Sequence, residues 1–261
     1  MKLEVILSPA ELPELAQRDL GEAACVVFDV LRATSTFVTA LQHGARAIVP
    51  VSEIDEALAR REQQPDVLLG GERDGVIIRA AQTGGVDFDL GNSPREYTPE
   101  RVRGRTIVST TTKGTRALRA GAGAQTVLAA AFLNLTATAR FLQQLKPASL
   151  VLVCAGTREN TALEDVLAAG ALADLLLNPL APPKRGKGRG EGFCAMNDSV
   201  ETALGAWRKA KSNLLASASA AENAQRLLAN PELRGDVAFC LQRDKFPLVA
   251  RMESGAIGRY P

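Results

Sequence analysis

Short runs of β-branched and apolar residues alternate along this chain with alanine-rich stretches. The apolar runs are typical of buried strands, and the stretches between them have helical character. The expected strands are "ACVVFDV", "AIVPV", "DVLLGGE", "RTIVSTT", "QTVLAAA" and "SLVLVCAG", and the clearest helices are "TSTFVTALQHGA" and "EIDEALARREQ". This alternation predicts an α/β fold with a largely parallel sheet covered on both faces. Ligands of such sheets bind where the carboxyl ends of the strands meet the following loops.

The last third of the chain is less regular. Residues 179–192 concentrate proline, glycine and positive charge without apolar periodicity, which predicts a mobile surface loop. Residues 199–230 are expected to be helical, and residues 236–253 to form a helix or strand of the core followed by an extended tail. A chain of 261 residues can bury one large core, so we expect a single α/β domain over residues 1–261, with room for two lobes.

Composition excludes several classes of protein. Hydrophobic residues make up 46% of the chain, charged residues 23%, and the net charge is +2, which predicts no nucleic-acid partner. The opening "MKLEVILSPA" contains an apolar run too short for a signal peptide or a membrane span, so we expect a cytoplasmic protein with no membrane partner. The cysteines are far apart, which favours buried free thiols over a zinc site or disulfides. They are Cys25, Cys154, Cys194 and Cys240.

The exit of the first long apolar run presents a carboxylate, a guanidinium and several hydroxyls. Asp29 ends "CVVFD" and is followed by Arg32 and by the hydroxyls of "ATST". A strand-end aspartate can bind Mg²⁺ or attack phosphorus, and Arg32 can hold an oxyanion. A capped helix with a surface ion pair is the alternative. Leu31 excludes the Asp-x-Asp signature of haloacid-dehalogenase-type phosphatases, and the lack of glycine here excludes a Rossmann fingerprint.

Two later turns also follow apolar runs and carry polar side chains. Glu72 and Arg73 lie in the glycine-bracketed turn "GGERDG", and Asn92 and Ser93 lie in "DLGNSP". Pro94 suits the first position of a helix, so turn geometry accounts for the proline and the glycines. The amide of Asn92 and the hydroxyl of Ser93 could in addition serve a ligand.

The stretch "IVSTTTKGT" places hydroxyls, a lysine and a glycine where a strand gives way to a helix. The hydroxyls and backbone N–H groups can bind a tetrahedral oxyanion, and the lysine adds a positive charge. The order Lys-Gly-Thr excludes a Walker A loop, which needs Gly-Lys-Thr. A simple capped helix is equally compatible with the segment. The candidate residues are Thr110, Thr111, Thr112, Lys113, Gly114 and Thr115.

Adjacent carboxylates follow the run "SLVLVCAG". Glu164 and Asp165 lie near the start of the next expected helix. The helix dipole favours negative charge there, which is one explanation for both residues. Paired carboxylates beside a strand exit are also suited to a hard divalent cation.

Taken in order, the motifs "FDVLRATST", "GERDG", "DLGNSP", "STTTKGT" and "CAGTRENTALEDVLAAG" resemble those of the 2-phosphosulfolactate phosphatase family, the ComB-like proteins. The resemblance extends from about Val26 to Ile257. It implies a three-layer α/β/α fold with a largely parallel or mixed sheet, and a Mg²⁺-dependent phosphatase that in some organisms makes sulfolactate for coenzyme M biosynthesis. Lys113 departs from the asparagine expected at its position, which either puts charge into the site or means that the side chain points away.

The resemblance predicts hydrolysis of the phosphate monoester of 2-phosphosulfolactate or of a similar small anionic phosphoester. It implies catalytic roles for Asp29, Arg32, Glu72 and Arg73, substrate binding by Asn92, Ser93 and residues 110–115, and Mg²⁺ ligation by Asp29, Glu164 and Asp165. Asp29 is either the nucleophile or a metal ligand. The alternatives are a non-catalytic binder of a phosphorylated carboxylate and a phosphatase of the same fold with another substrate. We also expect a homo-oligomer.

Overall fold

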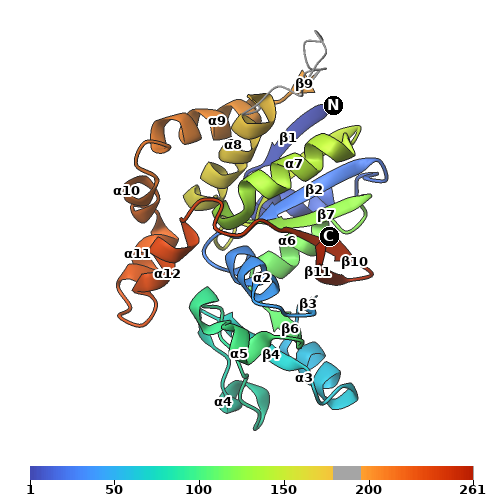
Figure 1. Ribbon diagram of the computed structural model, residues 1–261, viewed down its shortest axis with the longest axis vertical. Helices are drawn as coiled ribbons and strands as arrows, with labels where there is room; N and C mark the ends of the chain where they lie inside the picture. Colours follow the sequence, from blue (N-terminus) through green and yellow to red (C-terminus); the bar gives the residue numbers. More distant parts are fainter. Residues whose placement is uncertain (179–194, 261) are drawn as a thin grey trace.

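The computed structural model describes residues 1–178 and 195–260, which form a mixed, mostly parallel sheet of eleven strands with helices on both faces (Figure 1). The strand order is β5-β4-β6-β3-β11-β10-β7-β2-β8-β1-β9. The strands are β1 (Lys2–Ile6), β2 (Ala23–Phe28), β3 (Ala47–Val51), β4 (Leu68–Arg73), β5 (Val76–Ile77), β6 (Thr106–Thr110), β7 (Thr126–Ala130), β8 (Ser149–Cys154), β9 (Ala195–Met196), β10 (Val249–Glu253) and β11 (Ala256–Tyr260).

Helices connect most of these strands. The α-helices are α1 (Leu12–Leu15), α2 (Ala33–Gln42), α3 (Ile54–Gln63), α4 (Ala80–Thr83), α5 (Pro99–Val102), α6 (Gly114–Ala120), α7 (Leu135–Leu145), α8 (Leu163–Leu177), α9 (Asp198–Ala210), α10 (Leu214–Ser219), α11 (Glu222–Leu228) and α12 (Arg234–Cys240). Short 3₁₀ helices lie at Pro9–Glu11, Pro94–Glu96 and Phe132–Asn134. All strands and helices expected from the apolar pattern are present.

The centre of the sheet is parallel and apolar. β2 pairs in parallel with β7 on one side and with β8 on the other, and β1 pairs in parallel with β8. Every residue of β2 and of β7 is buried. Parallel strands that are covered on both faces need apolar side chains on both faces, which explains continuous runs such as "ACVVF".

Helices form one layer on each side of this sheet. Val26 belongs to the core that also contains Leu167 of α8 and Trp207 of α9, whereas Val27 belongs to the core that contains Phe37 of α2. Successive side chains of a strand point to opposite faces, so neighbouring residues of β2 enter different cores. The predicted three-layer α/β/α fold is confirmed.

A third and smaller core lies beneath α3 at the β4–β6 end of the sheet. It consists of Val51, Ala57, Val67, Leu69, Ile78, Phe88 and Val108. If the molecule is divided into two lobes, this small core belongs to the second lobe. The single domain over residues 1–261 stays a prediction.

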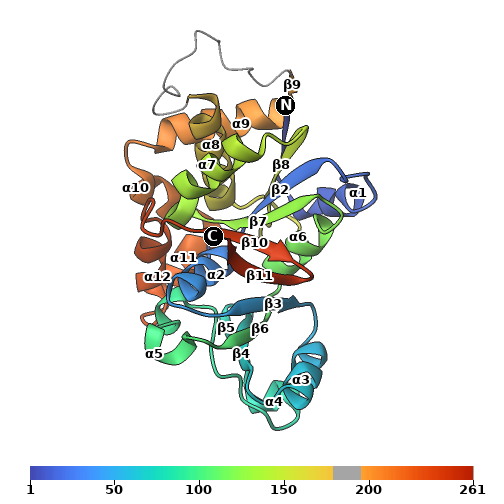
Figure 2. The same cartoon turned by 45° about the vertical axis from the view of Figure 1, so that its right-hand side comes forward.

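The segment expected to be an extended tail is a β-hairpin inside the sheet. β10 pairs antiparallel with β7 and with β11, and β11 pairs antiparallel with β3 through Ile257 and Ile48. Both views show this dark red hairpin between β7 and β3 (Figure 1 and Figure 2). Ser254 and Gly255 form the turn with φ values of 49° and 79°, as a type I′ hairpin turn requires. The prediction of a tail was wrong because this turn was overlooked.

Three further expectations concern membrane-spanning helices, the cysteines and the loop at 179–192. Among the described residues, no helix has both the length and the apolar character needed to cross a membrane. Cys25, Cys154 and Cys240 are buried free thiols, as predicted. The expected mobile loop at 179–192 and Cys194 lie outside the described residues.

Helices α8 and α9 lie side by side in close contact, and this contact depends on a glycine (Figure 1). A Cβ atom on Gly170 would lie 2.1 Å from the carbonyl oxygen of Ala203. A Cβ atom on Gly205 of α9, in contrast, would have no neighbouring group within 4 Å. Two glycine-to-alanine changes in neighbouring helices should therefore have opposite effects.

We predict that Gly170→Ala lowers the free energy of unfolding by about 1–3 kcal/mol, because α8 and α9 would have to move apart. Gly205→Ala, the matched control, should raise it by ~0.5–1 kcal/mol through helix propensity alone. Urea denaturation followed by circular dichroism measures both. Equal effects of the two substitutions would show that the close approach of α8 and α9 does not matter for stability.

Candidate active site

The polar strand exits identified in the sequence meet at the carboxyl ends of β2, β4, β6 and β8. Two hydrogen bonds show this convergence, of which the first is buried. The backbone N–H of Val30 after β2 donates to Asp165 of α8 at 2.8 Å, and the backbone N–H of Thr112 after β6 donates to Glu72 of β4 at 3.1 Å. Segments from residues 29 to 165 thus form one buried polar site.

Gly114 explains how the loop after β6 reaches Asp29, although several strands separate β6 from β2 in the sheet. A Cβ atom on Gly114 would lie 2.8 Å from Cβ of Ala33 and 3.0 Å from Oδ2 of Asp29. Only glycine permits this approach of the backbone to the carboxylate. The glycine of "TTTKGT" therefore sets the geometry of the site.

Asp29 follows β2 directly and is only 7% exposed. Its Oδ1 accepts the backbone N–H of Ala33 at 3.1 Å, whereas its Oδ2 accepts no hydrogen bond from the described residues. Burial raises the pKa of Asp29, and the nearby Lys113 ammonium partly opposes this rise. One oxygen of Asp29 is thus available to a ligand beside the Gly114 backbone.

Asp165 holds two loops together. Its Oδ1 accepts the N–H of Val30 at 2.8 Å, and its Oδ2 accepts the N–H of Gly156 at 3.0 Å. It therefore fixes the loop after β2 to the loop after β8. Burial, with the charges of Glu164 and Asp29, raises the pKa of Asp165 despite these hydrogen bonds.

Glu164 is the least satisfied carboxylate of the site. It lies in the first turn of α8 and is 1% exposed. Its Oε1 accepts a hydrogen bond from Nδ2 of Asn223 at 2.7 Å, while its Oε2 is buried without any hydrogen-bond partner among the described residues. Burial raises the pKa of Glu164. A buried acceptor without a protein partner is costly, so this oxygen is suited to bind a cation or an external donor.

Lys113 points into the site. Its Nζ lies 3.2 Å from Oγ1 of Thr157 and 3.5 Å from Oδ1 of Asn223. Lys113 forms no ion pair with a described carboxylate. It nevertheless lowers the pKa of both Asp29 and Glu164 against the larger effect of burial. The sequence left open whether the Lys113 side chain puts its charge into the site or points away from it, and in the structure the charge lies in the site.

Glu72 shapes the loop between β4 and β5. Its Oε2 accepts the N–H of Gly75 at 2.7 Å, and its Oε1 accepts both the N–H and the hydroxyl of Thr112 at 3.1 Å and 3.0 Å. The two hydrogen bonds tie Thr112 to the turn after β4. The Thr112 hydroxyl proton is thus used within the protein.

Arg73 and Thr110 are bound to the loop after β3. Thr110 donates its hydroxyl to the carbonyl oxygen of Ser52 at 2.9 Å and accepts a hydrogen bond from Arg73 at 3.0 Å. Arg73 also donates to the carbonyl oxygens of Glu72 and Ser52. The Thr111 hydroxyl, in contrast, lies close to Gly114 beside Asp29 and 3.5 Å from the hydroxyl of Thr115.

Arg32 is held by a buried aspartate that the sequence did not reveal. Its guanidinium donates to Oδ2 of Asp236 at 2.8 Å and to the carbonyl oxygen of Gly75 at 2.6 Å. Oδ1 of Asp236 accepts from Ser93 and from Arg95, both at 2.7 Å. Asp236 lies in α12 and is fully buried, so it fixes Arg32 and Ser93 at the edge of the site.

The remaining predicted residue, Asn92, is buried beside α2. Its carbonyl oxygen accepts a hydrogen bond from Thr36 at 2.9 Å. Its side-chain amide forms no hydrogen bond with the described residues, so the amide can bind a ligand.

Three site residues were missed from the sequence: Thr157, Asn223 and Asp236. Thr157 and Asn223 contact the Lys113 ammonium, and Asn223 also donates to Glu164 and to Thr157. Asn223 and Asp236 lie on α11 and α12, helices of seven residues each that precede the hairpin. Only Thr157 had a signal, because it ends the strand exit "CAGT".

A divalent cation fits this site on the chemistry of its oxygens. No group of three or more His, Cys, Asp or Glu side chains in the described part of the chain is arranged for a metal. Mg²⁺, however, is commonly held by one or two carboxylates together with substrate phosphate and water. The unpartnered oxygens of Glu164 and Asp29 provide this smaller set.

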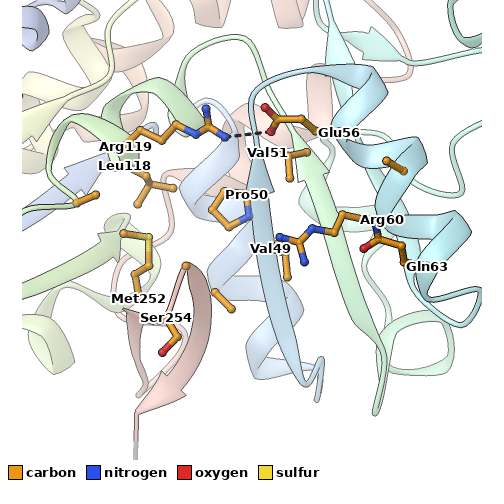
Figure 3. Close-up of a pocket in the computed structure, with 14 residues that line it drawn as sticks. Val49, Pro50, Val51, Glu56, Arg60, Gln63, Leu118, Arg119, Met252 and Ser254 are labelled. Atoms are coloured by element: carbon orange, nitrogen blue, oxygen red, sulfur yellow. Dashed lines mark hydrogen bonds and ion pairs between the residues drawn. The ribbon is translucent and has the colours of Figure 1, made fainter.

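A separate cavity of ≈ 520 Å³ lies between β3, α3, α6 and the β10–β11 turn (Figure 3). Its walls are largely apolar, with Val49, Pro50 and Leu118 among them, and its one ion pair joins Arg119 to Glu56. None of the predicted site residues lines it. A phosphoester needs converging cations and metal-binding oxygens, so we place the active site at the strand ends.

Comparison with known proteins points to one family. A family model described as 2-phosphosulpholactate phosphatase matches residues 9–255. The chain is 36% identical over 244 residues to a protein of Caldanaerobacter subterraneus, covering 92% of each chain, and 36% identical over 251 residues to one of Prochlorococcus marinus, covering 95% of each. Both relatives bear the name probable 2-phosphosulfolactate phosphatase. The chain belongs to the 2-phosphosulpholactate phosphatase family.

Proposed function

We propose that this protein hydrolyses the phosphate monoester of 2-phosphosulfolactate, or of a closely similar small acid, to the alcohol and inorganic phosphate. Membership of the family supports the reaction class and the substrate type. The observation that carries the proposal is the buried, unpartnered Oε2 of Glu164 in the same site as Asp29 and the Lys113 ammonium. A carboxylate oxygen with no protein partner, in the same site as an ammonium with no carboxylate partner among the described residues, suits a metal ion together with a phosphoester.

Mg²⁺ would be held by Asp29 and Glu164, and when bound it would neutralise charge on the phosphoryl oxygens. We move Asp165 from the predicted metal ligands to a positioning role, because both of its oxygens accept backbone N–H groups. Asp165 holds the loop that carries Asp29 in a fixed position against α8. This assignment leaves one free oxygen on each proposed ligand.

The substrate phosphate would be bound by Lys113 and by backbone N–H groups at the start of α6. The N–H groups of Gly114 and Thr115 have no acceptor among the described residues, and Gly114 lies beside Asp29. Arg32, fixed by Asp236, and the free amide of Asn92 would bind the remaining anionic groups. Such preorganised donors provide most of the stabilisation in phosphoryl transfer.

In this proposal, four predicted residues have a structural role in holding the loops of the site together: Glu72, Arg73, Thr110 and Thr112. Their hydrogen bonds join the loops after β3, β4 and β6. Substrate contacts by these side chains, together with the cytoplasmic location, the homo-oligomer and a role in coenzyme M biosynthesis, stay predictions.

A nucleophilic role for Asp29 is the alternative to the proposed metal ligation, because both would use its free Oδ2. As a nucleophile its Oδ2 would attack phosphorus, the ester P–O bond would break, and water would hydrolyse the aspartyl-phosphate. As a ligand it would share the metal with Glu164 while water attacks phosphorus directly. Both roles need the carboxylate in its ionised form.

Phosphate release tests the proposal. We expect turnover of 2-phosphosulfolactate, with 2-phospholactate and p-nitrophenyl phosphate as weaker substrates, and loss of activity in EDTA that Mg²⁺ restores. Asp29→Asn should lower kcat by a factor on the order of 10³ or more, because both roles of Asp29 need its charge. Asp55→Asn, an exposed aspartate of α3, is the matched control and should be unaffected. No turnover above the Asp29→Asn background would refute the phosphatase.

The unpartnered oxygen of Glu164 also predicts a stability effect. Because burial raises the pKa of Glu164 above its ordinary value of 4.5, the folded protein binds the proton more tightly than the unfolded chain. Without metal, the free energy of unfolding should therefore fall as the pH rises from about 4.5 towards neutrality. Glu164→Gln removes this charge and should make the metal-free protein more stable at pH 7 by about 1–3 kcal/mol.

Thermal unfolding in EDTA across this pH range gives the measurement. The control is Glu201→Gln, because Glu201 occupies the first turn of α9 as Glu164 occupies that of α8 but is exposed. It should leave the slope of stability against pH unchanged. A Glu164→Gln protein that is less stable than wild type at pH 7 would mean that this carboxylate is compensated in the folded state.

A further inference from the structure

The Lys113 ammonium contacts Thr157 and Asn223 in the site, and Arg226 of α11 donates to the same oxygen of Asn223 at 3.5 Å. Both contacts of Lys113 are to neutral groups, at 3.2 Å and 3.5 Å. The ammonium is thus held close to the site's carboxylates without being neutralised by an ion pair. A charge held in this way acts on whatever ligand enters the site.

The charges of the site oppose one another. Asp29 and Glu164, when ionised, carry two negative charges. With the positive charge of the Lys113 ammonium, the net charge of the three groups is −1. A divalent cation held by the two carboxylates is repelled by the ammonium, and a phosphate group is attracted by it. Both carboxylates lie near the ammonium: Glu164 shares the side chain of Asn223 with it, and Asp29 Oδ2 lies beside the backbone of Gly114, the residue next to Lys113.

We propose that Lys113 sets the balance between the two ligands of the site, weakening the binding of the divalent cation by Asp29 and Glu164 and strengthening the binding of the phosphate group. This inference rests on the proposed function, because it takes the metal to lie at Asp29 and Glu164. Without the phosphoester the site then binds the free cation weakly, and the phosphoester supplies the charge that holds the cation.

Removal of the ammonium should leave the rest of the site intact. Asn223 donates to Glu164 at 2.7 Å and to Thr157 through its own amide, so neither contact needs the lysine. Lys113 precedes α6 as its N-cap residue, and its side chain makes no capping hydrogen bond. A change of side chain at position 113 therefore removes the charge and its two contacts with neutral groups.

Mn²⁺ binding, measured by electron paramagnetic resonance without phosphate, tests the cation half. We expect Lys113→Gln and Lys113→Met to bind Mn²⁺ about tenfold more tightly than wild type, which corresponds to ~1.4 kcal/mol. Lys113→Arg, which keeps the charge, should remain close to wild type. Lys209→Gln, at an exposed position of α9, removes the same charge far from the site and should have no effect.

Calorimetric titration with inorganic phosphate in EDTA tests the anion half. Lys113→Gln and Lys113→Met should bind phosphate at least roughly fivefold more weakly, which corresponds to ~1 kcal/mol. Opposite shifts for Mn²⁺ and phosphate support the inference, because a general loss of structure would weaken both.

Three results would overturn the inference. Unchanged or weaker Mn²⁺ binding in both charge-removing variants, with measurable binding in wild type, would reject it and leave the proposed phosphatase standing. Unchanged phosphate binding in both variants would reject it in the same way. Absence of Mn²⁺ binding in every variant, and in wild type, would reject it together with the proposed metal site, while the phosphate-release assay would separately decide the activity.

Discussion

The burial of several carboxylates at one end of the sheet is the constraint on which the site depends. Asp165 is compensated by two backbone N–H groups, and Asp236 by Arg32, Ser93 and Arg95. Glu164 has a partner for only one oxygen, and the same is true of Asp29. Removing charged oxygens from water is costly unless a cation or donor replaces the water. The fold therefore bears an energetic cost that a bound metal phosphoester would offset.

The fold provides the rigidity that this arrangement needs. Asp29 follows a fully buried strand, Glu164 starts a long buried helix, and Asp165 connects the two through backbone hydrogen bonds. Gly114 lets the loop after β6 pass beside Asp29, although the β10–β11 hairpin separates the two halves of the sheet. Helices α11 and α12 then close the site with Asn223 and Asp236.

Much of this could be predicted from the sequence, because local patterns encode it. The apolar runs predicted the parallel strands. The polar residues at or shortly after the strand ends predicted Asp29, Glu164 and the 110–115 loop as candidate site residues. The hairpin was overlooked because its signal is only the dipeptide Ser254–Gly255 between two short runs. Asn223 and Asp236 could not be found, since they lie on helices far along the chain and become site residues only through tertiary packing. The use of Asp165 as a backbone anchor likewise depends on contacts across 135 residues.

The central claim is that Asp29 and Glu164 together hold a divalent cation beside Lys113. Anomalous diffraction from crystals grown with Mn²⁺ and inorganic phosphate tests it directly. The account predicts one anomalous peak in contact with carboxylate oxygens of both Asp29 and Glu164, with phosphate between the metal and the Lys113 ammonium. A peak bound elsewhere, with Glu164 Oε2 hydrogen-bonded to a protein donor instead, would contradict it.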